Sequence, residues 1–281
     1  MSRKLAMVTG ANSGMGLATS IGLAKAGMRV VMVCRSEARG KEALAKVRDA
    51  AGGDAAELML CDLGSFADIR RFAAEFNSRG DALDVLVNNA GVVSLKRTLT
   101  KDGFESMIGI NHLGHFLFTM LLLDRIKEAK QGRIVVVASG AYKAGRLNFN
   151  DLNLTKGFNV AKGYGQSKLA NILFARSLAK RLVGTTTTVN SLHPGAVATN
   201  IGVSRETGFG KSVHVLLKPF FLTPEQGSET ALHLALSPEA KDASGEYFYK
   251  KQAQALTGKA ADDESAERLW KWSMEAVGLK G

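Results

Sequence analysis

The chain has 281 residues, of which 46% are hydrophobic and 22% charged, and its formal net charge is +11 at pH 7. This composition is that of a globular protein and excludes an intrinsically disordered chain. The positive charge is compatible with three kinds of partner: nucleic acids, anionic membrane surfaces and anionic small molecules. Two cysteines, Cys34 and Cys61, are too few for a disulfide framework. They favour a reducing compartment, and we expect a cytoplasmic protein.

Short apolar segments alternate with longer helical patterns along the chain. We expect strands at residues 5–9, 29–33, 57–60, 84–87, 133–138, 186–192 and 246–249, and helices at 14–26, 37–50, 65–79, 104–129, 162–182, 224–236 and 262–277. Residues 134–137 are apolar throughout, as in a sheet that is buried on both faces. The alternation predicts an α/β fold: a single doubly wound Rossmann-type domain over residues 1–281, with a mostly parallel sheet of about seven strands and helices on both faces.

We expect no transmembrane segment. The longest apolar stretch, residues 116–123, is far shorter than the roughly 20 residues that a spanning helix needs. The first apolar run ends at Thr9-Gly10 and is too short for the core of a signal peptide. Peripheral contact with a membrane surface stays open, because a surface helix needs no spanning length.

A glycine-rich turn joins the first expected strand to the first helix. Its spacing is Gly-x3-Gly-x-Gly, and no lysine follows the last glycine, which argues against a P-loop. Glycines let the backbone approach a diphosphate, and the helix N-terminus supplies amide donors. The turn therefore predicts a dinucleotide site, the alternative being a tight turn without a ligand. The expected contact residues are Gly10, Asn12, Ser13, Gly14, Met15 and Gly16.

The end of the second expected strand indicates which dinucleotide binds. Enzymes that select NAD place an acid here for the ribose 2′-hydroxyl, whereas this chain has Arg35, with Arg39 one helical turn further on. A guanidinium matches a 2′-phosphate, so we predict NADP(H) as the cofactor. Glu37 lies nearby and weakens this selectivity, and an ordinary surface arginine is the alternative interpretation.

Tyr164 and Lys168 are four residues apart at the start of an expected helix and share one face. A tyrosine pKa of about 10 is too high for easy proton transfer near neutrality, and a nearby ammonium lowers it. Such a pair is common by chance, so its meaning depends on other residues. Here Asn88-Asn89-Ala90-Gly91 follows the fourth strand, Ser139 follows the fifth, and Asn111 opens the apolar part of the long helix.

These segments and Pro194-Gly195 occur in the order typical of short-chain dehydrogenases/reductases, and the chain resembles that family over nearly its whole length. It is most similar to the retinol-dehydrogenase-like branch, through residues 111–116, residues 164–171 and Leu269-Trp270. Ala138 stands where that branch commonly has a second serine, and Tyr142 where it often has a histidine. The branch's membrane anchor has no counterpart that we recognise here.

The resemblance implies catalytic roles for four residues. Tyr164 would donate or accept the proton, and Ser139 would hydrogen-bond the substrate oxygen. Lys168 would lower the pKa of Tyr164 and hold the ribose, and Asn111 would keep a water in a proton relay. Further implied cofactor contacts are Asp62 and Leu63 at the adenine, Asn89, Ala90 and Gly91 on the adenosine side, and Pro194, Gly195 and Thr199 at the nicotinamide, with Val197 between them.

The resemblance also implies a substrate-binding lid at residues 200–223. This segment is largely apolar, which favours a lipophilic or aromatic substrate, unless it packs inward as part of the core. The family often pairs subunits, so we expect a homodimer or homotetramer. Residues 116–123 could form that contact or pack in the core.

We therefore expect an NADP(H)-dependent oxidoreductase that interconverts a small-molecule carbonyl, an aldehyde or ketone, with an alcohol, and uses Tyr164 as general acid/base. One alternative is a catalytically silent NADP-binding sensor or scaffold. A less favoured one is a double-bond reductase like the protochlorophyllide reductases, whose active-site cysteines have no counterpart here.

Nucleic acid and metal are not expected as partners. The chain has no stripe of interleaved aromatic and basic residues that would bind nucleic acid. His112 and His115 have a spacing that zinc sites can use, but no further ligand cluster accompanies them. Residues 143–181 hold eight basic side chains and one acidic, Asp151. This excess could steer an anion towards the site, touch a membrane or be a solvated helix face.

Overall fold

The structure is a computed structural model that describes residues 3–195 and 222–280. Within these residues one eight-stranded sheet has the order β3-β2-β1-β4-β5-β6-β7-β8. The strands are β1 (Leu5–Thr9), β2 (Arg29–Cys34), β3 (Ala56–Leu60), β4 (Val85–Asn88), β5 (Arg133–Val137), β6 (Thr188–His193), β7 (Tyr247–Tyr249) and β8 (Gln252–Gln254). The first seven run parallel and β8 is antiparallel to β7. The predicted mostly parallel, doubly wound sheet is confirmed.

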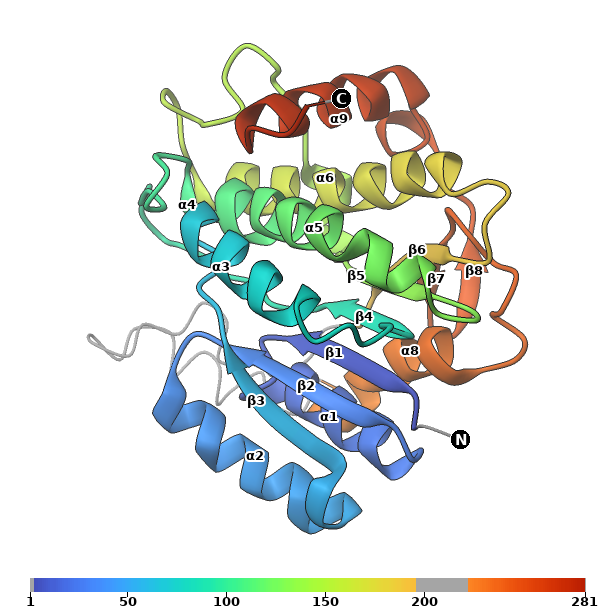
Figure 1. Ribbon diagram of the computed structural model, residues 1–281. Helices are drawn as coiled ribbons and strands as arrows, with labels where there is room; N and C mark the ends of the chain where they lie inside the picture. Colours follow the sequence, from blue (N-terminus) through green and yellow to red (C-terminus); the bar gives the residue numbers. More distant parts are fainter. Residues whose placement is uncertain (1–2, 196–221, 281) are drawn as a thin grey trace.

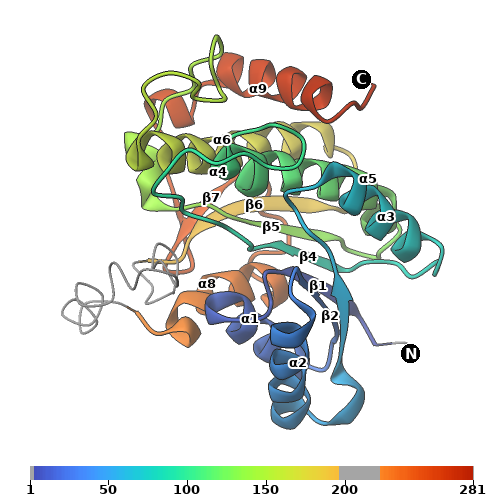
Figure 2. The same cartoon turned by 90° about the vertical axis from the view of Figure 1, so that its left-hand side faces the viewer.

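Helices cover both faces of the sheet (Figures 1 and 2). One face carries α1 (Gly14–Lys25), α2 (Glu37–Ala51) and α8 (Pro224–Leu236). The other carries α3 (Phe66–Asn77), α5 (His115–Lys127) and α6 (Val160–Arg181), with α9 (Asp263–Ala276) packed outside α6. Short 3-10 turns are η1 (Gly53–Ala55), η3 (Gly140–Ala144) and η5 (Gly258–Ala260). The expected helix at 104–129 is instead α4 (Ser106–Ile108), a π-helical segment (Gly109–Gly114) and α5.

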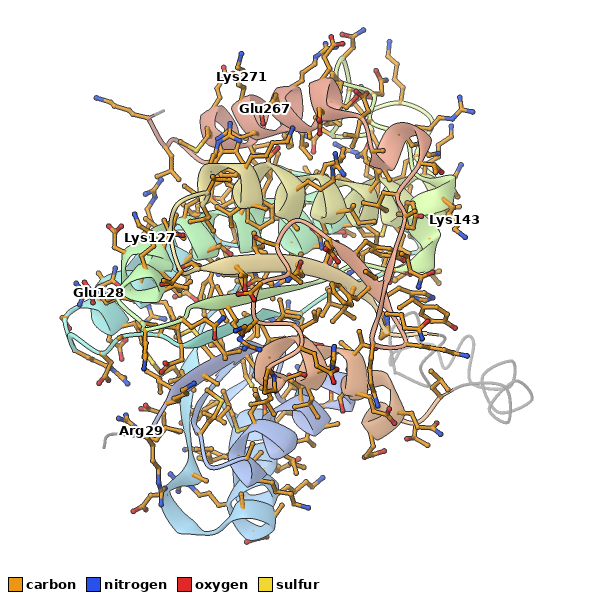
Figure 3. All side chains as sticks on the ribbon, turned by 90° about the vertical axis from the view of Figure 1, so that its right-hand side faces the viewer. Arg29, Lys127, Glu128, Lys143, Glu267 and Lys271 are labelled. Carbon is orange, nitrogen blue, oxygen red and sulfur yellow. The ribbon has the colours of Figure 1, made fainter. Side chains whose placement is uncertain are left out.

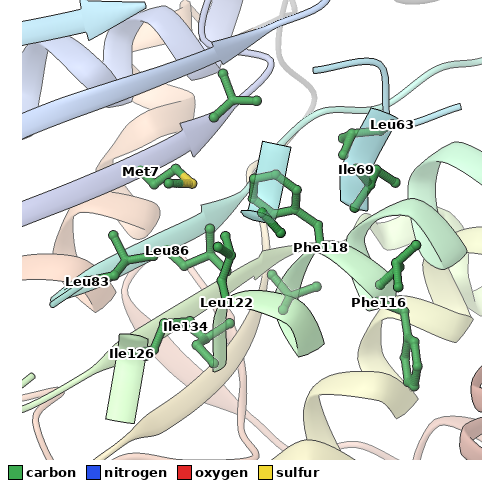
Figure 4. Packing of buried hydrophobic residues seen from close by; sticks show 14 of the residues in the cluster. Met7, Leu63, Ile69, Leu83, Leu86, Phe116, Phe118, Leu122, Ile126 and Ile134 are labelled. Carbon is green, nitrogen blue, oxygen red and sulfur yellow. The ribbon is translucent and has the colours of Figure 1, made fainter. Parts of the chain in front are cut away.

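Each face of the sheet has its own hydrophobic core, because successive side chains of a strand point to opposite faces. Along β1, Val8 belongs to the cluster beneath α1, α2 and α8, and Met7 belongs to the cluster beneath α3 and α5. Figure 4 shows this second cluster, with Met7 on one side and Ile69 and Phe118 on the other. Burial on both faces explains why these strands are apolar throughout.

The apolar residues 116–123 lie mainly in the core. Phe116, Phe118 and Leu122 are fully buried, while Leu121 is only partly so. By length and composition, the helix Ser106–Lys127 is the one candidate membrane span in the part of the chain that the structure describes. A buried core helix passes the same test, and 78% of its most apolar window is buried inside the protein.

Gly114 lets this central helix approach the loop after β3. A Cβ at this position would lie 2.4 Å from the backbone oxygen of Leu63, which cannot move without its loop. We expect Gly114→Ala to lower the free energy of unfolding by about 1–3 kcal/mol, measured by denaturant titration. Gly40→Ala is the matched control, because its Cβ would meet only the methyl groups of Leu58, which can rotate away. Equal losses in both variants would contradict this account.

Candidate active site

The carboxyl ends of the parallel strands all lie on the same side of the molecule. The predicted site residues follow these strand ends. Figure 3 shows this polarity, with Arg29 at the start of β2 and Lys143 just after β5 at opposite ends of the molecule. The loops after β1, β2, β3, β4, β5 and β6 carry the predicted cofactor contacts and Ser139. Val197, Thr199 and nearly all of the expected lid at 200–223 lie outside the described residues.

The glycine turn has the geometry of a diphosphate cradle. Gly10 and Gly14 have φ values of +67° and +52°, a left-handed conformation that favours glycine. A Cβ on Gly16 would lie 2.4 Å from both Asn89 Nδ2 and Gly10 O, so only glycine lets α1 come this close. Ser13 precedes α1 but its side chain makes no capping hydrogen bond, and the first turn carries no acid. The amides at this helix N-terminus therefore suit an anionic ligand.

Asn12 and Met15 belong to the same turn. Met15 is buried in the first turn of α1, and Asn12 is partly exposed. Both therefore lie where the prediction put them, at the carboxyl end of β1.

Thr9, the last residue of β1, ties this turn to the segment after β4. Its Oγ1 accepts hydrogen bonds from the backbone N–H groups of Asn89 (2.9 Å) and Ala90 (3.0 Å). The Asn89 amide donates in turn to Thr9 O at 2.7 Å. Sequence reasoning missed Thr9, because a threonine that ends a buried strand belongs to no motif by itself. Its position directly before Gly10 was the available signal.

The end of β2 presents two guanidinium groups. Arg35 is exposed and Arg39 is partly exposed at the start of α2. Neither forms an ion pair with any residue that the structure describes. Glu37, the competing acid, is instead 2.7 Å from Lys41, and hydrogen bonding to that ammonium lowers the pKa of Glu37. The surroundings thus favour an anionic group beside Arg35.

The residues expected at the adenine and the nicotinamide follow the ends of β3 and β6. Asp62 Oδ1 accepts from Gly64 N at 3.0 Å, which shapes the loop that holds the buried Leu63. Gly195, after Pro194, has φ +89° and donates its N–H to His193 Nδ1 at 3.2 Å.

The four predicted catalytic residues converge beside Gly91. A Cβ on Gly91 would be 3.6 Å from both Asn111 Oδ1 and Lys168 Nζ. Lys168 Nζ lies 5.6 Å from the centre of the Tyr164 ring. The Ser139 hydroxyl accepts from Ala141 N at 3.2 Å and lies close enough to Tyr164 to act on the pKa of its phenol.

A close backbone contact sets the spacing between Ser139 and Tyr164. A Cβ on Gly145, just after η3, would lie 2.1 Å from Gly165 O, and one on Gly165 would lie 2.9 Å from Gly145 N. The turn after Ser139 therefore rests directly on α6 next to Tyr164. Neither glycine was predicted as a site residue, although Gly165 directly follows Tyr164 in the sequence.

Burial is the largest cause of the pKa shifts of Tyr164 and Lys168. It raises the pKa of Tyr164 above its usual value, and the hydrogen bond with Ser139 acts in the opposite direction. Burial also lowers the pKa of Lys168 to about 8. Lys168 was expected to lower the pKa of Tyr164. In the structure its ammonium donates to Val137 O at 3.1 Å, and the net shift of Tyr164 is upward.

Part of the basic excess of α6 is neutralised by α9. Arg176 and Lys180 lie 2.6 and 2.8 Å from Asp263, and Arg181 lies 2.6 Å from Glu267, which Figure 3 shows on α9. These three basic side chains connect two helices. They are therefore not available to steer an anion towards the site.

Comparison with known proteins identifies relatives of the whole chain. Residues 4–208 match the family described as short chain dehydrogenase. Mouse retinol dehydrogenase 14 is 44% identical over 299 residues, which cover 99% of this chain and 87% of that protein. Other retinol dehydrogenases are 38–40% identical over at least 98% of this chain.

Solved structures agree with these relatives. A structure of an uncharacterised protein from Mycobacterium paratuberculosis has a TM-score of 0.78 and 31% identity, covering 99% of this chain and 95% of that one. Actinorhodin polyketide ketoreductase, solved with NADPH, has a TM-score of 0.67 and 28% identity, covering 87% and 94%. Both share the fold of this chain.

Proposed function

This chain belongs to the short-chain dehydrogenase family and to its retinol-dehydrogenase-like branch, and from that membership we propose that it is an NADP(H)-dependent oxidoreductase. It interconverts a carbonyl and an alcohol on a lipophilic or aromatic substrate, with Tyr164 as general acid/base. The observation that carries the proposal is the convergence of Asn111, Ser139, Tyr164 and Lys168 near Gly91, at the carboxyl ends of the strands.

The chemistry follows from how these groups are held. Tyr164 gives its proton to the carbonyl oxygen during reduction and takes it back during oxidation. Ser139, whose hydroxyl lies close to Tyr164, stabilises the charge that develops on the same oxygen. NADP(H), when bound, supplies or accepts the hydride. Lys168 and Asn111 both border Gly91, and we expect Tyr164 to be reprotonated through these two residues.

Aromatic side chains support a lipophilic or aromatic substrate. The rings of His193 and Tyr249, at the carboxyl ends of β6 and β7, stack with centroids 4.9 Å apart. Tyr142 lies on η3, directly after Ser139. Such rings provide apolar contact area near the reacting oxygen.

The proposal is tested by assaying the purified protein with NADPH and a panel of aldehydes that differ in polarity. We expect NADPH oxidation with long polyene and aromatic aldehydes, and much lower kcat/KM with short polar ones. Tight NADPH binding without turnover on any member of the panel would favour the silent sensor instead.

Arg35 provides a test of cofactor choice. We expect Arg35→Asp to reduce the preference for NADPH over NADH by about 10–100-fold, because a charge-assisted hydrogen bond of roughly 1.5–3 kcal/mol is lost. The ratio of kcat/KM with the two cofactors measures this. Lys46→Asp, at an exposed position of α2, makes the same charge change and should leave the ratio unaltered. An unchanged ratio in Arg35→Asp would refute the 2′-phosphate assignment.

A further inference from the structure

His115 is a buried histidine to which the proposed chemistry assigns no role. It begins α5, is 1% exposed, and is one helical turn from Asn111. His112, on the same helix and equally buried, bonds to Ser273 Oγ at 2.8 Å, on the side towards α9. The two rings therefore serve different parts of the fold, and only that of His115 points to the site.

The hydrogen bonds of Thr9 determine what His115 does. The Thr9 hydroxyl has two lone pairs, and both are taken by the N–H groups of Asn89 and Ala90. Its one hydrogen is left for His115 Nε2 at 2.8 Å, a shorter contact than the 3.4 Å to Val87 O. His115 Nε2 is therefore the acceptor.

The second ring nitrogen of His115 then carries the hydrogen. Nδ1 donates to the backbone carbonyl of Asn111 at 3.1 Å. Burial lowers the pKa of His115 to about 4, which agrees with a neutral ring in this single tautomer.

The π-helical segment changes the backbone partner of His115. In an α-helix that carbonyl would accept the backbone N–H of His115, four residues on. Here the His115 N–H bonds to His112 O instead. The side chain of His115, and not its backbone N–H, is thus the part of this residue that bonds to the Asn111 carbonyl.

The side chain of Asn111 is hydrogen-bonded to α6, the catalytic helix, which carries Tyr164 and Lys168. Its Nδ2 donates to Ser167 Oγ at 3.0 Å, and Ser167 Oγ donates to Tyr164 O at 2.9 Å. Its Oδ1 accepts from Val92 N at 2.8 Å. One continuous chain of hydrogen bonds therefore runs from the glycine turn through His115 and Asn111 to the catalytic helix.

We propose that His115 is a positioning residue that connects the dinucleotide turn, through Thr9, to the backbone carbonyl of Asn111. Its Nε2 orients the turn that binds the cofactor, and its Nδ1–H orients Asn111. The first of these effects rests on the NADP(H) binding of the proposed function, and the second rests also on its catalysis.

Two substitutions separate the two nitrogens. The amide nitrogen of His115→Asn is as far from Cβ as Nδ1, so this variant keeps the donor to Asn111 and loses the partner of Thr9. The amide of His115→Gln reaches as far as Nε2, so it keeps Thr9 and loses Asn111. We expect His115→Asn to raise the Kd for NADPH about tenfold with little change in kcat at saturating NADPH. We expect His115→Gln to lower kcat about tenfold with little change in Kd.

Controls distinguish this role from packing. His112→Asn and His112→Gln also replace a buried imidazole and should lower the free energy of unfolding by a similar amount. Both should leave kcat and the Kd for NADPH within about twofold of wild type. A merely structural His115 would shift stability in both variants and give no opposite split between Kd and kcat. That result would overturn the proposal.

The tautomer can be read from the unaltered protein, even if the variants do not fold. Nitrogen-15 NMR of the histidine-labelled chain should show His115 neutral and protonated on Nδ1 at neutral pH, with and without NADPH. A ring protonated on Nε2, or on both nitrogens, would refute the assignment. If the wild type binds NADPH but reduces no carbonyl, the proposed function fails, while the Kd of His115→Asn and the tautomer still test this inference.

Discussion

Replacing Tyr164 by phenylalanine is expected to lower kcat/KM for aldehyde reduction by about 10²–10⁴-fold, the usual contribution of a positioned general acid. The variant loses only the hydroxyl that Ser139 contacts, so the Kd for NADPH and the unfolding midpoint should stay close to those of the wild type. Steady-state assays and NADPH fluorescence measure the two quantities. Tyr247→Phe removes the same atom from a buried tyrosine of β7 and should retain turnover.

The pH dependence of the wild type provides a second readout of Tyr164. Burial raises its pKa, so the phenol stays protonated through neutral pH and remains available as an acid. The reductive kcat should therefore be flat across neutral pH, whereas alcohol oxidation, which needs the phenolate, should increase as the pH rises. If Tyr164→Phe reduced aldehydes at the wild-type rate, the proposed mechanism would be wrong.

Replacing Lys168 by methionine is expected to stabilise the protein while it removes activity. The ammonium is buried, and its pKa is lowered to about 8, so folding at neutral pH places a charge where it is unfavourable. Val137 O keeps a second donor, Asn171 Nδ2 at 3.2 Å, so methionine leaves no unpaired carbonyl. We expect the free energy of unfolding to rise by roughly 1–3 kcal/mol near pH 7, and turnover to fall more than about 100-fold.

The sign of the pH dependence makes this prediction specific. The folded-state pKa of about 8 lies below the ordinary value of 10.5, so the unfolded chain holds more protons between these two pH values. Wild-type stability therefore gains from the titration of Lys168 as the pH rises from 8 towards 10.5, and the advantage of Lys168→Met shrinks over the same range. Denaturant titrations at several pH values measure this difference. Lys162→Met, at an exposed position of the same helix, should change stability by less than about 0.5 kcal/mol at any of them.

The sequence predicted most of the fold because buried parallel strands have a strong apolar signal. It did not predict β8, whose three residues, Gln252–Gln254, are all exposed and have no such pattern. The hairpin that pairs β8 with β7 turns at Lys250 and Lys251, which have φ values of +50° and +66°. Lysines give no turn signal of the kind that glycine or asparagine gives, so only pairing with β7 reveals the strand.

The long helix expected over residues 104–129 was also predicted only in part from the sequence. Its apolar pattern predicted one helix over residues 104–129, and the structure interrupts it with the π-helical segment Gly109–Gly114. Two glycines of this segment lie close to residues outside the helix, Gly114 to Leu63 and Gly109 to Thr100. The periodicity of apolar residues along the chain does not predict such contacts.

By itself the sequence determined the family, the βα alternation and the candidate catalytic residues, because ordered motifs and apolar strands are local features of the chain. Tertiary structure decided the pKa values, the protonation and the charge partners of these residues. The upward pKa shift of Tyr164 and the downward shift of Lys168 come from burial. The tautomer of His115 comes from Thr9, 106 positions away, and part of the charge of α6 is balanced by α9. Desolvation and hydrogen-bond partners depend on segments that are brought together only by folding, so no local pattern encodes them.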